Sequence, residues 1–321
     1  MGDPAGVGPE LCLRILRDPI VTAACVPVVF GDLDVLLRVA DAARLVSPPG
    51  IVTLEAWQSR PDAREPMVVD CGAITKGAFE PGTVNAECGR AAAAYIEAAV
   101  SAATVGAVAG VVTAPIHKEA LHLAGSPYAG HTEMLAALTG ATKVCMMMAS
   151  DAMIVSLATI HIGLAAVKEA LTLDCIVDAV DLTGEALRRI GKAVPRIAVC
   201  GLNPHGGEHG LFGREEEEIV LPAVLEARRR GWCVEGPLAP DTAFVPGKRA
   251  IVDAYIAMYH DQGLIPFKML AFETGVNVTL GLPIVRTSVD HGTAFDIAWK
   301  GTASATSMVH AIQWAIRLAR R

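Results

Sequence analysis

The sequence predicts an α/β fold in which helices pack on a mostly parallel sheet. Short β-branched segments alternate with longer helix-forming segments along the whole chain, which is typical of this class. Ala, Val, Leu and Gly dominate the composition, and 52% of the 321 residues are apolar against 19% charged. Such a composition excludes a disordered chain. Because a domain typically has roughly 150 residues, the length predicts two domains.

The individual elements follow from periodicity and from residues that stop helices and strands. The strand over residues 107–113 stops at Ala114-Pro115, and the helix over residues 215–231 has a charged face and ends at Gly231. The last helix carries Arg in its final turn. We expect strands at residues 26–30, 107–113, 145–148, 154–159, 196–201, 254–258 and 276–280, and helices at residues 32–39, 83–103, 132–138, 164–190, 215–231 and 303–320.

Charge and cysteine usage restrict the class of protein. Lys and Arg number 27 against 34 Asp and Glu, a net charge of −7, which argues against nucleic acid or an anionic membrane as the main partner. The longest apolar stretches, residues 91–112 and 144–167, contain charged residues, so neither is expected to span a membrane. The eight cysteines show no CxxC spacing, and the N-terminus has no apolar export segment. We expect a cytoplasmic protein with reduced thiols.

The Gly-rich N-terminus has two interpretations. Residues 6–11 read Gly-Val-Gly-Pro-Glu-Leu, which lacks the third Gly of a dinucleotide-binding fingerprint. The segment is either a tight turn that enters a helix or a loop that faces a ligand with Asp3 and exposed amides. A loop of this kind normally follows a strand, so a truncated or misassigned start that omits a first strand is one expectation.

An anion site is indicated where Gly130-His131-Thr132-Glu133 precedes a helix. The first N–H groups of a helix have no intrahelical partner and lie at its positive dipole end, which favours a bound anion. His131 and Thr132 add two side-chain donors at that point. The alternative is simple N-capping by Thr132 with an incidental histidine.

Three histidines lie at the ends of expected strands. His161 follows residues 157–160, His205 ends Gly-Leu-Asn-Pro-His, and His260 follows Met-Tyr. The carboxyl ends of parallel strands face the ligand crevice in this class of fold. Three imidazoles there suit a divalent metal ion such as Zn²⁺ or Co²⁺, although the spacing matches no metal motif and each remains open to interpretation as an ordinary histidine.

Further polar residues lie in a mostly apolar region near the C-terminus. Lys268 and Arg286 are cations in apolar segments, where each either reaches a ligand or forms an ordinary ion pair. Asn277 lies between them, and the loop after Asp290 contains Gly292, which allows close approach of a ligand to the backbone.

Several unusual motifs occur in order along the chain: residues 2–10, Thr113-Ala114-Pro115-Ile116-His117-Lys118, and residues 130–133, 202–205, 212–216, 258–263, 275–283 and 286–294. Together they resemble the 4-hydroxythreonine-4-phosphate dehydrogenase family over essentially the whole chain. The resemblance implies an NAD-dependent enzyme that requires a divalent metal ion (Zn, Co, Mg or Mn) and forms a homodimer with a shared active site.

The resemblance also implies roles for single residues. His161, His205 and His260 are expected to bind the metal, with His260 reaching in from the partner subunit. Substrate contacts are expected from His131, Thr132, Lys268, Asn277 and Arg286. As a separate mechanistic hypothesis, Lys268 stabilises the developing oxyanion or relays a proton, and Asp241 and Asp261 are candidate bases or partners of the metal ligands.

A more distant similarity concerns the cofactor. Residues 291–301 look like the NAD-binding loop of isocitrate and isopropylmalate dehydrogenases, which have two α/β domains around a cleft and no Rossmann fingerprint. NAD contacts are therefore expected from His291, Gly292, Thr293 and Ala294. The expected domains are residues 1–125 plus 265–321, on the cofactor side, and residues 126–264, with the metal ligands and the dimer interface.

The expected reaction is oxidation of the C3 hydroxyl of a 4-phosphorylated four-carbon acid, followed by decarboxylation of the 3-oxo acid. The substrate is either 4-hydroxythreonine 4-phosphate, on the route to pyridoxine, or threonate or erythronate 4-phosphate, which residues 113–115, 118–121 and 296–299 favour. Alternatives are the dihydrodiol dehydrogenase of terephthalate breakdown, a phosphate acyltransferase and a non-catalytic metabolite-binding protein.

Overall fold

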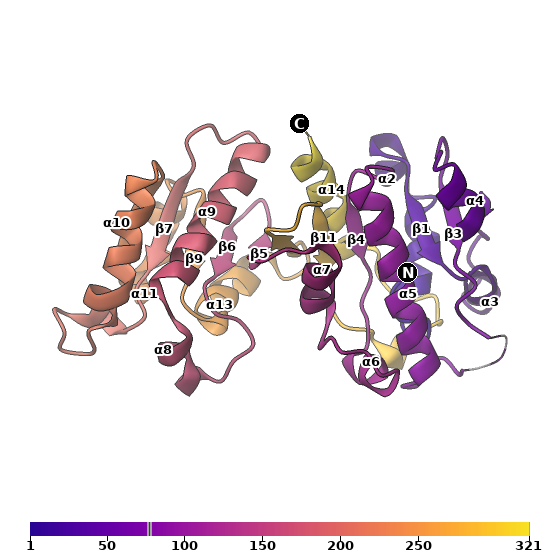
Figure 1. Ribbon diagram of the computed structural model, residues 1–321, viewed down its shortest axis with the longest axis horizontal. Coiled ribbons are helices and arrows are strands. Elements are labelled where there is room, and N and C mark those ends of the chain that lie inside the picture. The colour runs from indigo at the N-terminus through magenta and orange to yellow at the C-terminus, as the bar shows by residue number, and fades with distance from the viewer. Residues whose placement is uncertain (76, 78, 321) are drawn as a thin grey trace. The chain divides into compact units, whose positions relative to one another are not determined.

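Figure 1 shows the computed structural model, which describes residues 1–75, 77 and 79–320. The fold is mixed α/β with parallel strands, as the sequence predicts, and the chain divides into two compact units. The first unit comprises Met1–Thr142 and Leu282–Ala319, and the body of the second is Lys143–Gly281.

The division lies C-terminal to the boundaries expected at residues 125/126 and 264/265. The helix α7 (His131–Thr139) falls in the first unit because its Met134 and Leu135 pack with Ile96 and Val100 of α5 (Ala86–Thr104). The helix α13 (His260–Ala271) falls in the second unit because it packs on the strands of that unit.

The first unit holds a three-stranded parallel sheet in the order β1-β3-β2 and a parallel pair formed by β4 and β11. Helices pack around these strands through apolar faces. The elements of this unit are α1 (Gly8–Ile15), α2 (Pro19–Ala24), β1 (Val28–Gly31), α3 (Leu33–Ala42), β2 (Ile51–Thr53), α4 (Leu54–Ser59), β3 (Met67–Asp70), α5, β4 (Val111–Thr113), α6 (Lys118–Leu123), α7, β11 (Arg286–Val289), the 3₁₀ turn η4 (Phe295–Ile297) and α14 (Thr306–Ala319).

A buried carboxylate fixes the chain before α14. Glu10 of α1 is completely buried and accepts hydrogen bonds from the backbone N–H groups of Gly301 and Ala303, at 3.1 and 2.9 Å. Arg14, one turn later, forms an ion pair with the same carboxylate. Buried charges are stable only when paired and hydrogen-bonded, so this cluster links α1 to the C-terminal segment.

The second unit is built on strands in the order β10-β5-β6-β9-β7-β8. The pairs β10–β5 and β5–β6 are antiparallel, whereas β6, β9, β7 and β8 run parallel. The elements are β5 (Cys145–Ala149), β6 (Ile154–Leu157), η1 (Leu164–Ala166), α8 (Val167–Ala170), α9 (Leu173–Arg189), β7 (Arg196–Cys200), η2 (Pro204–Gly207), the π-helical turn η3 (Glu216–Val220), α10 (Leu221–Arg229), β8 (Cys233–Leu238), α11 (Pro240–Ala243), α12 (Pro246–Arg249), β9 (Ala254–Ala257), α13 and β10 (Val276–Leu280).

Helix α13 is absent from the sequence prediction because Gly263 and Pro266 lie inside it, and both residues disfavour helix interiors. The structure explains the glycine. A Cβ atom at Gly263 would lie within 3.0 Å of side-chain atoms of Val155, Leu157 and Ala257, so the helix packs directly on β6 and β9. Close packing against the sheet outweighs the local propensity.

The predicted helix over residues 164–190 is three shorter elements. Thr172 interrupts it as the N-cap of α9, and its hydroxyl accepts a hydrogen bond from the N–H of Cys175.

The sequence does not predict the short strands β2, β3, β8 and β11. Each is only three to six residues long, which leaves little periodicity to read.

All eight cysteines are free thiols, and four of them are buried. Burial raises the pKa of the Cys145 and Cys200 thiols to about 12. Among the described residues, no helix combines the length and the apolar character that crossing a bilayer requires.

Candidate functional site

Two predicted metal ligands lie together in the second unit. His161 follows β6 and His260 begins α13 directly after β9, and these strands are parallel neighbours. The centroids of the two imidazole rings are 5.6 Å apart. Because both histidines belong to one chain, His260 needs no second subunit to meet His161.

The third histidine follows the next strand of the same sheet. His205 lies in η2 after β7, which pairs with β9 on the side away from β6. Its ring centroid lies 6.0 Å from that of Phe212, and the side chain is exposed. Within the described part of the chain, no three His, Cys, Asp or Glu side chains are grouped closely enough to hold one metal ion. The structure therefore brings together two of the three expected ligands.

The backbone is strained at two of these histidines. His161 has φ +20° and His205 has φ +54°, in the left-handed region that residues with a Cβ rarely adopt. Such conformations cost about 1–3 kcal/mol each and concentrate at functional sites.

A buried carboxylate holds the His205 loop. Glu216 Oε1 accepts the backbone N–H groups of Leu202 and Asn203, both at 2.7 Å. The Asn203 amide donates to Glu215 and to Glu216, and the Lys168 ammonium beside Glu215 lowers the pKa of that carboxyl to about 2. The two carboxylates thus fix the backbone immediately before His205.

The two predicted aspartates have different surroundings. Asp261 Oδ1 lies 2.6 Å from His260 Nδ1, although its side chain is 70% exposed. Asp241 is exposed on α11, which packs against η2, the element of His205. Asp261 is therefore in place to orient His260. Asp241 instead lies on a helix that packs against the element of His205.

The remaining candidates of this unit lie on α13 and β10. Lys268 is half-buried on α13, with its Nζ atom 5.7 Å from the ring centroid of Phe272. Asn277 is half-buried on β10, opposite Met148 of β5.

In the first unit, α7 begins at His131 as the sequence indicates. Gly130 is the N-cap, and no side chain caps the helix, so the alternative of N-capping by Thr132 is wrong. Within the described residues, the buried His131 Nε2 atom has no hydrogen-bond partner. Burial, and then the positive charge of Arg286, hold the pKa of His131 well below its usual value, so its imidazole is neutral.

Arg286 is the first residue of β11 and is 3% exposed. Its Nη2 atom donates to Thr113 Oγ1 of β4 at 2.7 Å, and burial lowers the pKa of the guanidinium to about 10, so it stays charged at neutral pH. A buried cation, a neutral imidazole with a free ring nitrogen and the start of a helix together favour an anion.

The expected cofactor loop packs on the Gly-rich N-terminal loop. Val7 N–H donates to Thr293 O at 3.0 Å, and a Cβ at Gly6 would lie 2.9 Å from the same oxygen. Ala294 is left-handed, His291 is exposed and an added Cβ at Gly292 would meet open space. The glycine at position 6 is thus required for contact between the two loops.

Asp3 of the N-terminal loop is 1% exposed. Its Oδ1 accepts the N–H of Ala5 at 2.9 Å, and burial raises the pKa of the carboxyl to about 6. The neighbouring His117 stacks on Phe295, with ring centroids 4.9 Å apart. Asp3 helps to form the turn that enters α1, which agrees with the interpretation of this loop as a helix entry. The raised pKa of its carboxyl agrees with the other interpretation, a loop that faces a ligand.

Sequence reasoning did not assign roles to Thr113, His117 or Glu216. Thr113 and His117 lie in the motif that follows β4, and the end of a parallel strand is a signal that could have identified them. Nothing local marks Glu216, because its role comes from a loop that lies more than ten residues earlier in the chain.

Comparison with known proteins identifies the family. The profile described as pyridoxal phosphate biosynthetic protein PdxA matches residues 23–315. A 4-hydroxythreonine-4-phosphate dehydrogenase of Desulforapulum autotrophicum is 46% identical over 98% of this chain and 93% of the relative. A D-threonate 4-phosphate dehydrogenase of Cupriavidus necator is 45% identical over 100% of this chain and 96% of the relative.

A solved structure is similarly close. The crystal structure of a 4-hydroxythreonine-4-phosphate dehydrogenase from Klebsiella pneumoniae superposes with a TM-score of 0.90 at 42% identity, covering 100% of this chain and 97% of that one. The sequence motifs resemble those of this family, and the comparisons agree: the chain belongs to the PdxA family.

Proposed function

We propose that this chain is a dehydrogenase that oxidises the C3 hydroxyl of a 4-phosphorylated four-carbon acid with NAD⁺ and a divalent metal ion, after which the 3-oxo acid loses CO₂. The observation that carries the proposal is the position of His161, His260 and His205 after three neighbouring parallel strands, with two of the rings adjacent. The relatives named for 4-hydroxythreonine 4-phosphate and D-threonate 4-phosphate supply the substrate class.

The donor set fits a divalent metal ion. Imidazole is the commonest protein ligand of such ions, and a carboxylate on the second ring nitrogen orients a ligating histidine. Asp261 contacts Nδ1 of His260 and so leaves Nε2 for the metal. When bound, the metal ion lowers the pKa of a hydroxyl that it contacts and stabilises charge on oxygen, while NAD⁺ accepts a hydride.

The other residues act on the substrate and cofactor. His131, Thr132 and Arg286 bind the phosphate, His131 as a neutral N–H donor and Arg286 as a buried cation held by Thr113. Asn277 contacts the substrate, and Lys268 stabilises the developing oxyanion. Asp261 is a positioning residue for His260, and Asp241 is a candidate acceptor of the hydroxyl proton. The loop of His291, Gly292, Thr293 and Ala294 holds the adenosine half of NAD⁺.

A homodimer with a shared active site is part of the proposal. Large apolar side chains follow each histidine and are exposed, and a contiguous apolar surface would mark an interaction site. They are Leu164 (71% exposed) after His161, Leu211 (71%) and Phe212 (47%) after His205, and Ile265 (59%), Met269 (81%), Leu270 (41%) and Phe272 (72%) after His260. A second copy that covers these residues lies beside the metal ligands. The crossing of His260 from the partner subunit stays a prediction, and the meeting of His161 with His260 within one chain argues against it.

The test is an assay of the purified protein after treatment with a chelator. The absorbance of NADH is followed with 4-hydroxythreonine, threonate and erythronate 4-phosphates side by side, before and after Zn²⁺, Co²⁺, Mn²⁺ or Mg²⁺ is restored. Turnover of one or more acids that depends on the metal is expected. Activity that survives complete metal removal contradicts the metal role, and binding of all three acids without turnover contradicts the enzymatic one.

His205→Ala tests the ligand assignment. The exposed His209 lies four residues later, also with a left-handed backbone, and His209→Ala is the matched control. Loss of turnover and metal in His205→Ala alone is expected, with the circular dichroism spectrum unchanged. Full activity of His205→Ala contradicts the assignment.

A further inference from the structure

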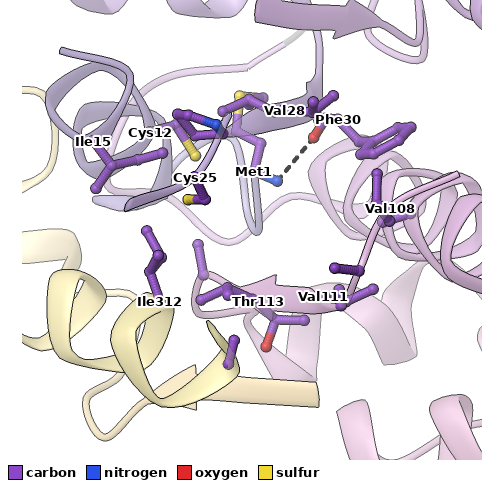
Figure 2. A pocket seen from close by; sticks show the side chains of 18 of the residues that line it. Met1, Cys12, Ile15, Cys25, Val28, Phe30, Val108, Val111, Thr113 and Ile312 are labelled. Carbon is purple, nitrogen blue, oxygen red and sulfur yellow. Dashed lines mark hydrogen bonds between the residues drawn. The ribbon is translucent and has the colours of Figure 1, made fainter. Parts of the chain in front are cut away.

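An apolar cavity of about 380 Å³ lies in the first unit, with Thr113 on its wall (Figure 2). Its lining also includes His131. Both residues belong to the phosphate site proposed above, so the cavity does not define a separate site.

In the second unit, a chain of buried hydrogen bonds crosses the sheet just before the three histidines. Each histidine has a residue of this chain two to four positions before it in the sequence: Thr159 after β6, Met258 after β9 and Gly201 after β7. The side chain of Gln262, the third residue of α13, joins the last two. All four residues are buried, so water does not compete for these hydrogen bonds.

The ends of β6 and β9 are joined directly. The backbone N–H and the hydroxyl of Thr159 both donate to Met258 O, at 3.2 and 2.7 Å. His161 and His260 each lie two residues further along the chain. Paired strand ends therefore bring these two imidazoles together.

The ends of β7 and β9 are joined through a side chain instead. Their backbone ladder ends where Val199 pairs with Ile256, and two residues further along each strand lie Gly201 and Met258. Gln262 Oε1 accepts the Met258 N–H at 2.6 Å, and Gln262 Nε2 donates to Gly201 O at 2.8 Å. Because that N–H can only donate and that carbonyl can only accept, the orientation of the amide is determined. Two hydrogen bonds and an amide group thus replace one bond of the ladder.

Helix α13 packs close enough to the sheet for Gln262 to reach between the strands. Side-chain atoms of β6 and β9 lie within 3.0 Å of the place where a Cβ atom of the next residue, Gly263, would be. A larger residue there would move the helix away from the sheet and withdraw the amide. The chain after Gly201 is also held from another direction, because Glu216 accepts the next two backbone N–H groups.

We infer that Gln262 is a positioning residue whose amide fixes the His205 loop relative to the adjacent pair of His161 and His260, with Thr159 fixing the ends of β6 and β9. This inference rests on the proposed function in one respect, that the histidines bind a metal ion. A loop that is fixed before the metal ion arrives loses less conformational freedom on binding, so the fixed backbone raises the metal affinity.

The alternative role of Gln262 is local. A Gln at the third helical position commonly accepts a backbone N–H near the start of the helix, as in a capping box, and this role needs only an acceptor. Gln262→Glu separates the two roles, because a carboxylate still accepts from the Met258 N–H but cannot donate to Gly201 O.

The first measurement uses the metal-free full chain and needs no enzymatic activity. Hydrogen–deuterium exchange of residues 201–209 should be about tenfold faster in Gln262→Glu and in Gln262→Met than in the parent, since local opening becomes easier. Thr183→Val removes a buried hydroxyl that bonds to Ser156, so it is the matched control for a general loss of stability and should leave these residues unchanged. Parental exchange in Gln262→Glu overturns the inference and assigns Gln262 to helix capping alone.

The second measurement is the affinity for Co²⁺, with the visible absorption spectrum of the bound ion as a report of its geometry. Gln262→Met, which is neutral and of similar size, should weaken Co²⁺ binding about tenfold or more and alter the spectrum, because loss of residues that orient metal ligands costs 10–100-fold. Thr159→Val should act in the same direction, whereas Thr159→Ser keeps the hydroxyl and should restore the parental values. The control Thr183→Val should bind Co²⁺ as the parent does.

The two measurements separate failure of this inference from failure of the proposed function. Parental Co²⁺ affinity and spectrum in Gln262→Met overturn the inference and leave the proposed metal site standing. A parent that binds no Co²⁺ contradicts the proposed function instead, and the exchange measurement alone then decides whether Gln262 holds the His205 loop.

Discussion

The imidazole rings of His161 and His260 lie 5.6 Å apart, centroid to centroid, at the ends of two neighbouring parallel strands. His161 is exposed and has a left-handed backbone conformation, whereas His260 is half-buried and contacts Asp261. In the proposed function these two neighbouring imidazoles form part of the metal site, so metal content directly measures their role.

Replacing either histidine is expected to remove the metal. His161→Ala and His260→Ala should each lower the affinity for Zn²⁺ at least about 100-fold, since loss even of a residue that orients a ligand costs 10–100-fold. Metal content after dialysis, measured by mass spectrometry, is the readout. His122→Ala, an exposed histidine on α6, is the control and should keep the metal of the parent. Full metal content in both site variants contradicts the assignment.

Replacing Thr113 is expected to weaken anion binding. Thr113→Val removes the oxygen that accepts from Arg286 Nη2 and leaves a buried charged donor less well satisfied. A hydrogen bond to a charged group contributes about 1.5–3 kcal/mol, so inorganic phosphate should bind roughly tenfold or more weakly. Calorimetric titration with phosphate measures this. Thr139→Val on the last turn of α7 is the control, and a comparable loss there argues for a general structural effect.

Replacing Glu216 is expected to loosen the His205 loop. Glu216→Gln weakens charge-assisted bonds to the N–H groups of Leu202 and Asn203 and should lower the free energy of unfolding by about 1–3 kcal/mol. Urea unfolding gives this value, and metal affinity should fall in the same variant. The adjacent Glu217 is exposed, so Glu217→Gln should change neither quantity. Unchanged stability of Glu216→Gln would show that the loop is held by other contacts.

The buried carboxyl of Asp3 should make stability depend on pH. Its pKa is raised from 3.8 to about 6, so the folded state binds the proton more tightly than the unfolded state. The stabilisation by the proton is complete below pH 3.8 and is lost as pH rises through about 6. At pH 8 the ionised carboxyl therefore costs about 3 kcal/mol, the free energy of roughly two pKa units.

Asp3→Asn removes this dependence. The variant should gain stability over the parent as pH rises from 4 to 8, most steeply near the raised pKa, and urea unfolding across this range measures the difference. The exposed Asp41→Asn is the control and should follow the parent at every pH. A constant difference between parent and Asp3→Asn across this range would refute the raised pKa.

The sequence by itself determined the α/β class, most of the long elements and the candidate residues. Helix α7 begins within one residue of its predicted start because a glycine followed by polar residues and an apolar run is a local signal. The histidines were identified because strand ends are visible in sequence and parallel strands place their carboxyl ends at one edge.

Tertiary structure decided what depends on contacts between distant segments. Helix α13 forms despite Gly263 and Pro266 because the glycine lets it pack on β6 and β9. Three contacts join residues that are far apart in the chain. His161 lies beside His260, Arg286 is buried beside Thr113, and Glu216 accepts hydrogen bonds from the backbone before His205. Local propensity carries no information about such contacts, since the strand order that creates them is set by the packing of the whole sheet.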